Sequence, residues 1–316
     1  MVNKVTRVCH YNKLSITMDG NIYPCCQTSL NRKIGNIFDD DIIEKIENTD
    51  IICECKMYKS TAHTSADKID LKIIHFETSN ICQANCVCCP QNKSKLPNEY
   101  EHLQKIRQLI EYFKPKSINV IGGEVLVQKN ALNMLSDLHK KYPDMDITTI
   151  TNLCVNDEQL NQAEEIFNRM TVSFLGFSNL IYENEMGLNF EKTMKNFRHL
   201  YDNKKIKLLP KYLTMPTNLF DIVPFFAWAL SLDVDKIYLH NIHEFAQVVN
   251  LEHKYWNRTF ENVEKQIKHL LNINKDKIIS TQKHYISIHQ ILADKLKITP
   301  EYLKENNFEN IIFITN

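Results

Sequence analysis

Glycine is scarce in this chain, and so are net charge and long apolar runs. The 316 residues include six glycines, against the ~7% that is usual, so we expect each glycine where a side chain would not fit. Lysine plus arginine equals aspartate plus glutamate at 38 each, which excludes the strong field that recruits nucleic acid or anionic membranes. No segment approaches the ~20 apolar residues that cross a bilayer, and no signal-peptide core is evident. We expect a cytoplasmic protein with no nucleic-acid or membrane partner.

Cysteine, in contrast, is abundant and unevenly distributed. Nine of the ten cysteines precede residue 90, and Cys154 lies apart from them. Because the cytoplasm keeps thiols reduced, such cysteines indicate metal or redox work rather than disulfides. Two groups of cysteines predict two metal sites. The first group is Cys9, Cys25, Cys26, Cys53 and Cys55, and the second is Cys82, Cys86, Cys88 and Cys89.

The second group follows a β-like segment, and Cys82, Cys86 and Cys89 have the spacing C-x3-C-x2-C. Three thiolates this close together can hold three corners of a cubane iron-sulfur cluster, which leaves the fourth iron open to a ligand. A structural zinc site would instead be closed by a fourth side chain. A zinc site and a chance cluster are the alternatives at this point, and Cys88 competes with Cys89 as the third ligand.

This cysteine loop resembles the signature of the radical S-adenosylmethionine (SAM) superfamily, in which it follows the first strand of a partial TIM barrel. The resemblance implies that Cys82, Cys86 and Cys89 hold a SAM-binding [4Fe-4S] cluster. It also implies reductive cleavage of SAM to a 5′-deoxyadenosyl radical, which abstracts hydrogen from a substrate. An external electron donor such as flavodoxin or ferredoxin would then be a partner.

The first group surrounds a predicted β-hairpin whose turn is Asp19-Gly20, followed by a short charged helix at about residues 40–48. The pattern from Cys9 to a closing cysteine pair resembles the twitch module, a shortened SPASM domain. The resemblance implies an auxiliary [4Fe-4S] cluster, with a zinc knuckle as the alternative. The implied ligands are Cys9, Cys25, Cys53 and Cys55, with Cys26 as an alternative ligand.

From about residue 70, short β-like runs alternate with amphipathic helical patterns, which is typical of a parallel α/β sheet. The predicted strands are 71–78, 116–121, 146–151, 170–176, 206–214 and 235–240, and the predicted helices are 99–113, 129–141, 157–168, 190–203 and 219–231. Six such units match the partial (β/α)6 TIM barrel that the resemblance implies, with the site at the C-terminal ends of strands. We predict an auxiliary-cluster module in residues 1–66, a barrel in 67–245 and a covering extension in 246–316.

Polar residues follow several of these strands. Gly122-Gly123-Glu124 ends the second strand, about thirty residues after the cysteine loop, and resembles the family's G-G-E motif. The glycines would let the backbone approach a ligand, and Glu124 would pair with the ammonium group of the methionine moiety. By the same resemblance, Asn152 and Ser173 are further SAM-binding candidates.

Two residues are candidates for catalysis. Glu77 can point into the barrel from the first strand. Cys154 can return a hydrogen atom to a substrate radical, as peptide epimerases of this superfamily do with a cysteine. An ordinary structural role is the alternative for both residues.

The resemblance favours a peptide substrate, because twitch and SPASM modules are frequent in peptide maturases. Dehydrogenation of a small molecule, a sugar or a nucleoside, is the first alternative. A non-catalytic iron-sulfur electron carrier or sensor is the second, and the G-G-E motif argues against it. The sequence leaves open whether the net reaction is oxidative or redox-neutral.

Overall fold

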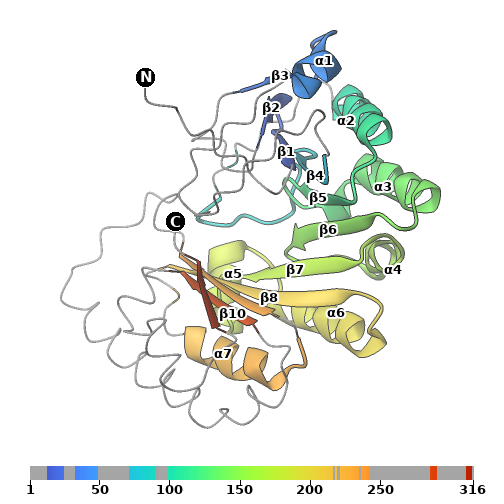
Figure 1. The fold of residues 1–316 in the computed structure, drawn as a ribbon. Coiled ribbons are helices and arrows are strands. Elements are labelled where there is room, and N and C mark those ends of the chain that lie inside the picture. Colours follow the sequence, from blue (N-terminus) through green and yellow to red (C-terminus); the bar gives the residue numbers. More distant parts are fainter. Residues whose placement is uncertain are drawn as a thin grey trace, which may run out of the picture. The chain divides into compact units, whose positions relative to one another are not determined.

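The computed structural model describes most of the barrel region and parts of the remaining chain. The described residues are 13–24, 33–48, 71–89, 91, 99–215, 218, 221–234, 236–241, 285–289 and 311–314. They fall into two compact units, whose elements are shown in Figure 1. Unit 1 takes its described residues from the ranges 1–82, 92–149 and 161–168, and unit 2 from 83–91, 150–160 and 169–316.

The sheet of unit 1 has the strand order β6-β5-β4-β1-β2-β3. Its strands are β1 (Lys13–Ile16), β2 (Asn21–Tyr23), β3 (Gly35–Asn36), β4 (Ile73–Glu77), β5 (Ser117–Ile121) and β6 (Asp146–Thr151), of which 146–149 belong to this unit. β1, β4, β5 and β6 run parallel to one another, whereas β2 and β3 continue antiparallel from β1. The N-terminal hairpin therefore continues the same sheet as the first barrel strand.

The helices of unit 1 cover one face of its sheet (Figure 1). They are α1 (Ile42–Glu47), α2 (Glu99–Phe113), the 3-10 turn η2 (Val125–Val127), α3 (Lys129–Lys141) and the second half of α4 (Asp157–Ile166). Phe76 of β4 and Val120 of β5 are fully buried on this face. Because side chains alternate along a strand, the half-buried His75 and Asn119 lie on the opposite face.

The described residues of unit 2 include five parallel strands in the order β11-β10-β9-β8-β7. The strands are β7 (Arg169–Phe174), β8 (Lys207–Thr214), β9 (Lys236–Asn241), β10 (Tyr285–His289) and β11 (Ile311–Ile314), and the helices are α5 (Asn179–Met186), α6 (Phe190–Asn203) and α7 (Ile222–Ser231). An aromatic core joins its helices to the sheet. The ring of Phe174 on β7 lies 6.3 Å from Phe197 of α6 and 5.5 Å from Trp228 of α7.

Most predicted elements are confirmed. β4 to β9 begin and end within two residues of the predicted strands, and α2, α3 and α6 coincide with the predicted helices. The sequence patterns do not predict α5 or β10. No helix among the described residues is long and apolar enough to span a membrane. The domain boundaries at 66/67 and 245/246 remain predictions.

Candidate active site

The cysteine loop begins shortly after β4. Cys82 belongs to unit 1, and Cys86 and Cys89 belong to unit 2. None of the three forms a disulfide, and Cys82 and Cys86 are half-buried whereas Cys89 is exposed. Among the described residues, no three His, Cys, Asp or Glu side chains form a group that could hold a metal ion. Cys9, Cys25, Cys26, Cys53 and Cys55, the predicted auxiliary ligands, lie outside the described residues.

Cys88 and Cys89, the two candidates for the third ligand position, differ in their exposure to solvent. Cys88 is buried, with 8% of its surface exposed, whereas Cys89 is exposed. Burial raises the pKa of the Cys88 thiol to about 11, and the neighbouring Cys89 adds to this effect. The backbone N–H of Cys89 donates to the carbonyl of Cys86 at 3.2 Å, which closes a turn. Cys89 is therefore the more accessible of the two cysteines, and its role as the third ligand remains a prediction.

The two glycines after β5 pack against the chain that leads to Cys82. A side chain at Gly122, which has φ +140°, would place its Cβ 2.6 Å from the carbonyl of Ser79. At Gly123 an added Cβ would overlap the carbonyl group of Ile81. The Gly123 N–H also donates to Ser79 O at 2.5 Å. The close approach that these glycines permit is thus an approach to their own chain.

The residues after the glycines hold the same segment. The N–H of Glu124 donates to Ile81 O at 2.8 Å, and Gln128 Nε2 donates to the same oxygen at 3.1 Å. The side chain of Glu124 is buried, and its Oε1 accepts the N–H of Leu126 at 3.1 Å, which caps η2. The carbonyl of Ile81, one residue before Cys82, therefore accepts two hydrogen bonds from the segment after β5.

In unit 2 the end of β6 holds the cysteine loop through Gln83. Gln83 Nε2 donates to Asn152 Oδ1 at 3.0 Å and to Cys154 O at 3.1 Å. The backbone N–H of Cys154 donates to the same Asn152 oxygen at 2.9 Å. Cys154 is buried, and its Sγ lies 3.7 Å from Asn189 O as a donor. Sequence reasoning missed Gln83, although an amide inside a C-x3-C loop is a signal that could have found it.

Asn218 and Asp221 are both buried, and their side chains form hydrogen bonds near the ends of the strands. Asn218 Nδ2 donates to the carbonyls of Leu175 and Leu213, which follow β7 and lie in β8, at 2.8 and 2.9 Å. Asp221 Oδ2 accepts the N–H of Phe177 at 2.8 Å, and it also accepts the N–H and the hydroxyl of the next residue. These two side chains fix the loop that follows β7.

Glu77, the other catalytic candidate, contacts the hairpin. Its Oε2 accepts the N–H of Met18 at 2.7 Å. Burial raises the pKa of its carboxyl group, and the Met18 hydrogen bond opposes this rise. On the same strand, His75 Nδ1 lies 2.7 Å from Asn119 Oδ1, and Asn119 Nδ2 donates to Thr148 Oγ1 at 2.8 Å. Burial lowers the pKa of His75 to about 4, so its imidazole is neutral at pH 7.

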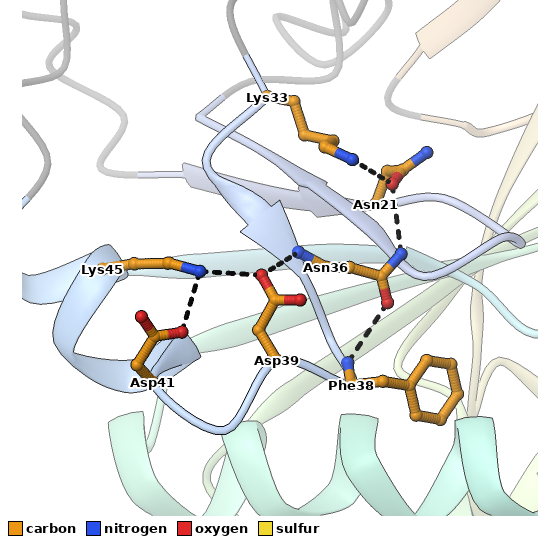
Figure 2. Close-up of polar contacts among 7 residues, drawn as sticks. All are labelled: Asn21, Lys33, Asn36, Phe38, Asp39, Asp41 and Lys45. Carbon is orange, nitrogen blue, oxygen red and sulfur yellow. Dashed lines mark hydrogen bonds and ion pairs between the residues drawn. The ribbon is translucent and has the colours of Figure 1, made fainter.

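The hairpin and α1 are joined by an exposed polar network (Figure 2). Lys45 of α1 pairs with Asp39 at 3.0 Å and Asp41 at 2.8 Å. Asp39 Oδ2 accepts the N–H of Asn36 at 3.0 Å, and Asn36 Nδ2 donates to Asn21 Oδ1 at 3.1 Å. Exposed pairs of this kind contribute little energy singly, but the network fixes the direction in which the chain leaves the hairpin.

Family models match most of this region. The model of the radical SAM superfamily matches residues 76–218, and the SPASM model, an iron-sulfur cluster-binding domain, matches residues 9–90. The chain carries a radical SAM domain and, partly overlapping it, an iron-sulfur cluster-binding SPASM domain. These two domains define SAM and [4Fe-4S] clusters, one of them auxiliary, as its cofactors. No curated protein matches the chain.

Solved structures agree on the fold. Streptococcus suis SuiB bound to the precursor peptide SuiA matches with a TM-score of 0.50 and 11% identity, over 78% of this chain and 57% of that one. Native anSMEcpe with bound AdoMet and Kp18Cys peptide matches with a TM-score of 0.50 and 15% identity, over 68% and 63%. The chain thus spans less than two thirds of either neighbour. The predicted α/β fold class, a partial TIM barrel, is confirmed.

Proposed function

We propose that this enzyme reductively cleaves SAM and abstracts a hydrogen atom from a peptide. One observation carries the proposal. The backbone N–H groups of the G-G-E segment donate hydrogen bonds to Ser79 O and Ile81 O, in the chain just before Cys82. An iron-sulfur carrier needs the cysteines but no SAM pocket, and the G-G-E segment is the one that the family resemblance assigns to SAM. The peptides in the titles of the two solved neighbours support the choice of substrate class.

The chemistry of the donors, rather than their positions in this structure, fits a SAM-binding cluster. Cys82, Cys86 and Cys89 have at least partly accessible surfaces, and soft sulfur ligands suit iron. When bound, the cluster supplies the electron that cleaves SAM to methionine and a 5′-deoxyadenosyl radical. Glu124 would meet the methionine ammonium group, since a carboxylate is its natural partner.

The remaining candidate residues would orient SAM and enclose the substrate. Asn152, whose Oδ1 accepts from Gln83, and Ser173 on β7 would lie against SAM, with Ser173 at the ribose. Cys154 would deliver hydrogen to the substrate radical, although its Sγ is directed to Asn189 O in this structure. Glu77 would hold the substrate only by giving up its bond to Met18.

The auxiliary cluster is proposed on residues outside the described part of the chain. Its ligands would be Cys9, Cys25, Cys53 and Cys55, with Cys26 as the alternative ligand. Four cysteine ligands leave no open iron, so this cluster would carry electrons or border the substrate. A flavodoxin or ferredoxin would supply electrons in the cytoplasm.

Iron analysis tests the proposal. Protein purified without oxygen and reconstituted should bind about eight irons per chain, as two cubane clusters. Replacing Cys82, Cys86 and Cys89 together by Ala should remove about half of the iron and abolish formation of 5′-deoxyadenosine from SAM. Cys88→Ala is the matched control and should retain both. Zinc in place of iron, or SAM cleavage by the triple variant, would refute the assignment.

A further inference from the structure

β8 presents a lysine on the face of the unit 2 sheet that its helices do not cover. Tyr212 of β8 packs against Phe225 of α7, with ring centroids 4.9 Å apart. Because side chains alternate along a strand, Lys211 lies on the opposite face. Its neighbours in register on β7 and β9 are also polar. The resulting row across three strands is Ser173, Lys211 and Tyr238.

The Lys211 ammonium group has no counter-charge among the described residues. No salt bridge or hydrogen bond joins it to a carboxylate in that part of the chain. Burial lowers the pKa of Lys211 to about 8, and the Cys88 thiol opposes this shift. The carboxylate of Glu185 on α5 acts electrostatically on Cys88 and Tyr212 instead. Lys211 is half-buried, and at pH 7 its amine is still mostly charged.

A half-buried charge without a partner is partly desolvated and reduces stability, and a bound anion would offset this cost. An ammonium group is a compact donor that suits carboxylates and phosphates alike. Ser173, the residue proposed at the SAM ribose, is the register neighbour of Lys211 on β7. An anion at Lys211 would therefore lie one strand away from that residue.

We propose that Lys211 binds an anionic group of the substrate, a carboxylate or a phosphate, beside Tyr238. The inference rests on the proposed function, because it places the substrate on the sheet face that carries Ser173. It adds a chemical requirement that the family match does not contain. A peptide would meet this requirement with an acidic side chain or its C-terminus, and a small molecule with a phosphate group.

The test compares thermal unfolding in sodium phosphate, sodium acetate and sodium chloride at equal ionic strength. A ligand that binds the folded state raises the unfolding temperature, so the wild-type protein should be stabilised by one of the two oxyanions relative to chloride. In Lys211→Met the anion concentration for half-maximal stabilisation should rise at least ~10-fold. Lys211→Met without anion should unfold at the same or a higher temperature, because Met removes a partly desolvated charge.

Two variants control the experiment. Lys207→Met removes an exposed lysine from the same strand and should respond to anions as the wild type does. Lys211→Arg keeps the charge and should keep the response. If wild type and Lys211→Met respond equally, or if Lys211→Met is less stable without anion, the proposal is overturned.

The anion that stabilises the protein indicates which kind of substrate carries the anionic group. A response to acetate indicates a carboxylate, as on a peptide, and a response to phosphate alone indicates a phosphorylated small molecule; both support the site. If Lys211→Met instead weakens SAM binding ~10-fold, the anion is the carboxylate of SAM and the substrate assignment is overturned. SAM cleavage is measured separately. Its absence in the wild type would reject the proposed function and leave the anion result standing.

Discussion

The carboxylate of Glu124 takes part in the turn after β5 as well as in the proposed binding of SAM. Its Oε1 accepts the N–H of Leu126, and only 1% of its surface is exposed. A glutamine in its place keeps an oxygen for this N–H but lacks the charge. The two contributions of this residue can therefore be separated by substitution.

We expect Glu124→Gln to keep the stability of the protein and to weaken SAM binding by at least ~10-fold, because the charge-assisted contact is lost. Glu124→Ala should weaken SAM binding equally and also reduce the free energy of unfolding by ~1 kcal/mol, since the cap of η2 is removed. Equilibrium binding of SAM and urea unfolding measure the two effects. Iron content should stay unchanged in both variants, and unchanged SAM affinity in Glu124→Gln would rule out the ammonium pairing.

At the scale of elements, helices and strands with a regular apolar period were predictable. A helix with a reversed burial pattern and a pairing between distant strands were not. α2 and α3 show apolar residues on one face, so their limits follow from the sequence. α5 reverses the usual pattern, with Leu180 exposed and Glu185 buried, so periodicity fails. The hairpin was predictable from its turn. The parallel pairing of β1 with β4 was not predictable, because the sequence of a strand does not specify which strand more than fifty residues away will pair with it.

The same limit applies to the site. Cys82, Cys86, Cys89 and the G-G-E segment were found because their spacing is local. The bond from Gln83 to Asn152 joins residues 69 apart and could not be read from spacing. The glycines were predicted at the right positions for a different reason, since they approach the chain rather than a ligand.

The contact between the β5–η2 segment and the chain before Cys82 can be tested with a methyl group. Gly123→Ala places a Cβ against the backbone of Ile81, which cannot rotate away, so we expect a loss of ~1–3 kcal/mol in the free energy of unfolding. Gly35→Ala is the matched control, because the three atoms nearest to its Cβ belong to the side chains of Asp39, Ile42 and Lys45 rather than to the backbone. Urea unfolding of both variants checks the difference. Equal stabilities would show that residues 78–81 do not pack as described.

For the whole molecule, the question is whether the N-terminal module is separable at residue 66. Four residues of β1 pair with β4 in unit 1, from Lys13 with Ile73 to Ile16 with Phe76. Leu14 and Ile16 are 2% and 0% exposed. The predicted boundary of 1–66 therefore cuts between paired strands of one sheet.

We expect a chain without residues 1–66 to be largely insoluble or aggregated, because β4 loses its neighbour and exposes unpaired backbone groups. Size-exclusion chromatography with light scattering of the soluble fraction measures this outcome. A deletion of residues 1–8, which leaves Cys9 and β1 to β3 in place, is the control and should yield monodisperse protein at the level of the full chain. A soluble, monodisperse 67–316 chain would instead support the predicted boundary.

The pairing of β1 with β4 also has a consequence for biosynthesis. The ribosome makes the hairpin before β4, so the strand that covers this edge is already available when β4 emerges. Newly exposed strand edges are the positions at which unfinished chains associate wrongly. With the cluster module placed first, the first barrel strand can be paired from one side before β5 has been synthesised.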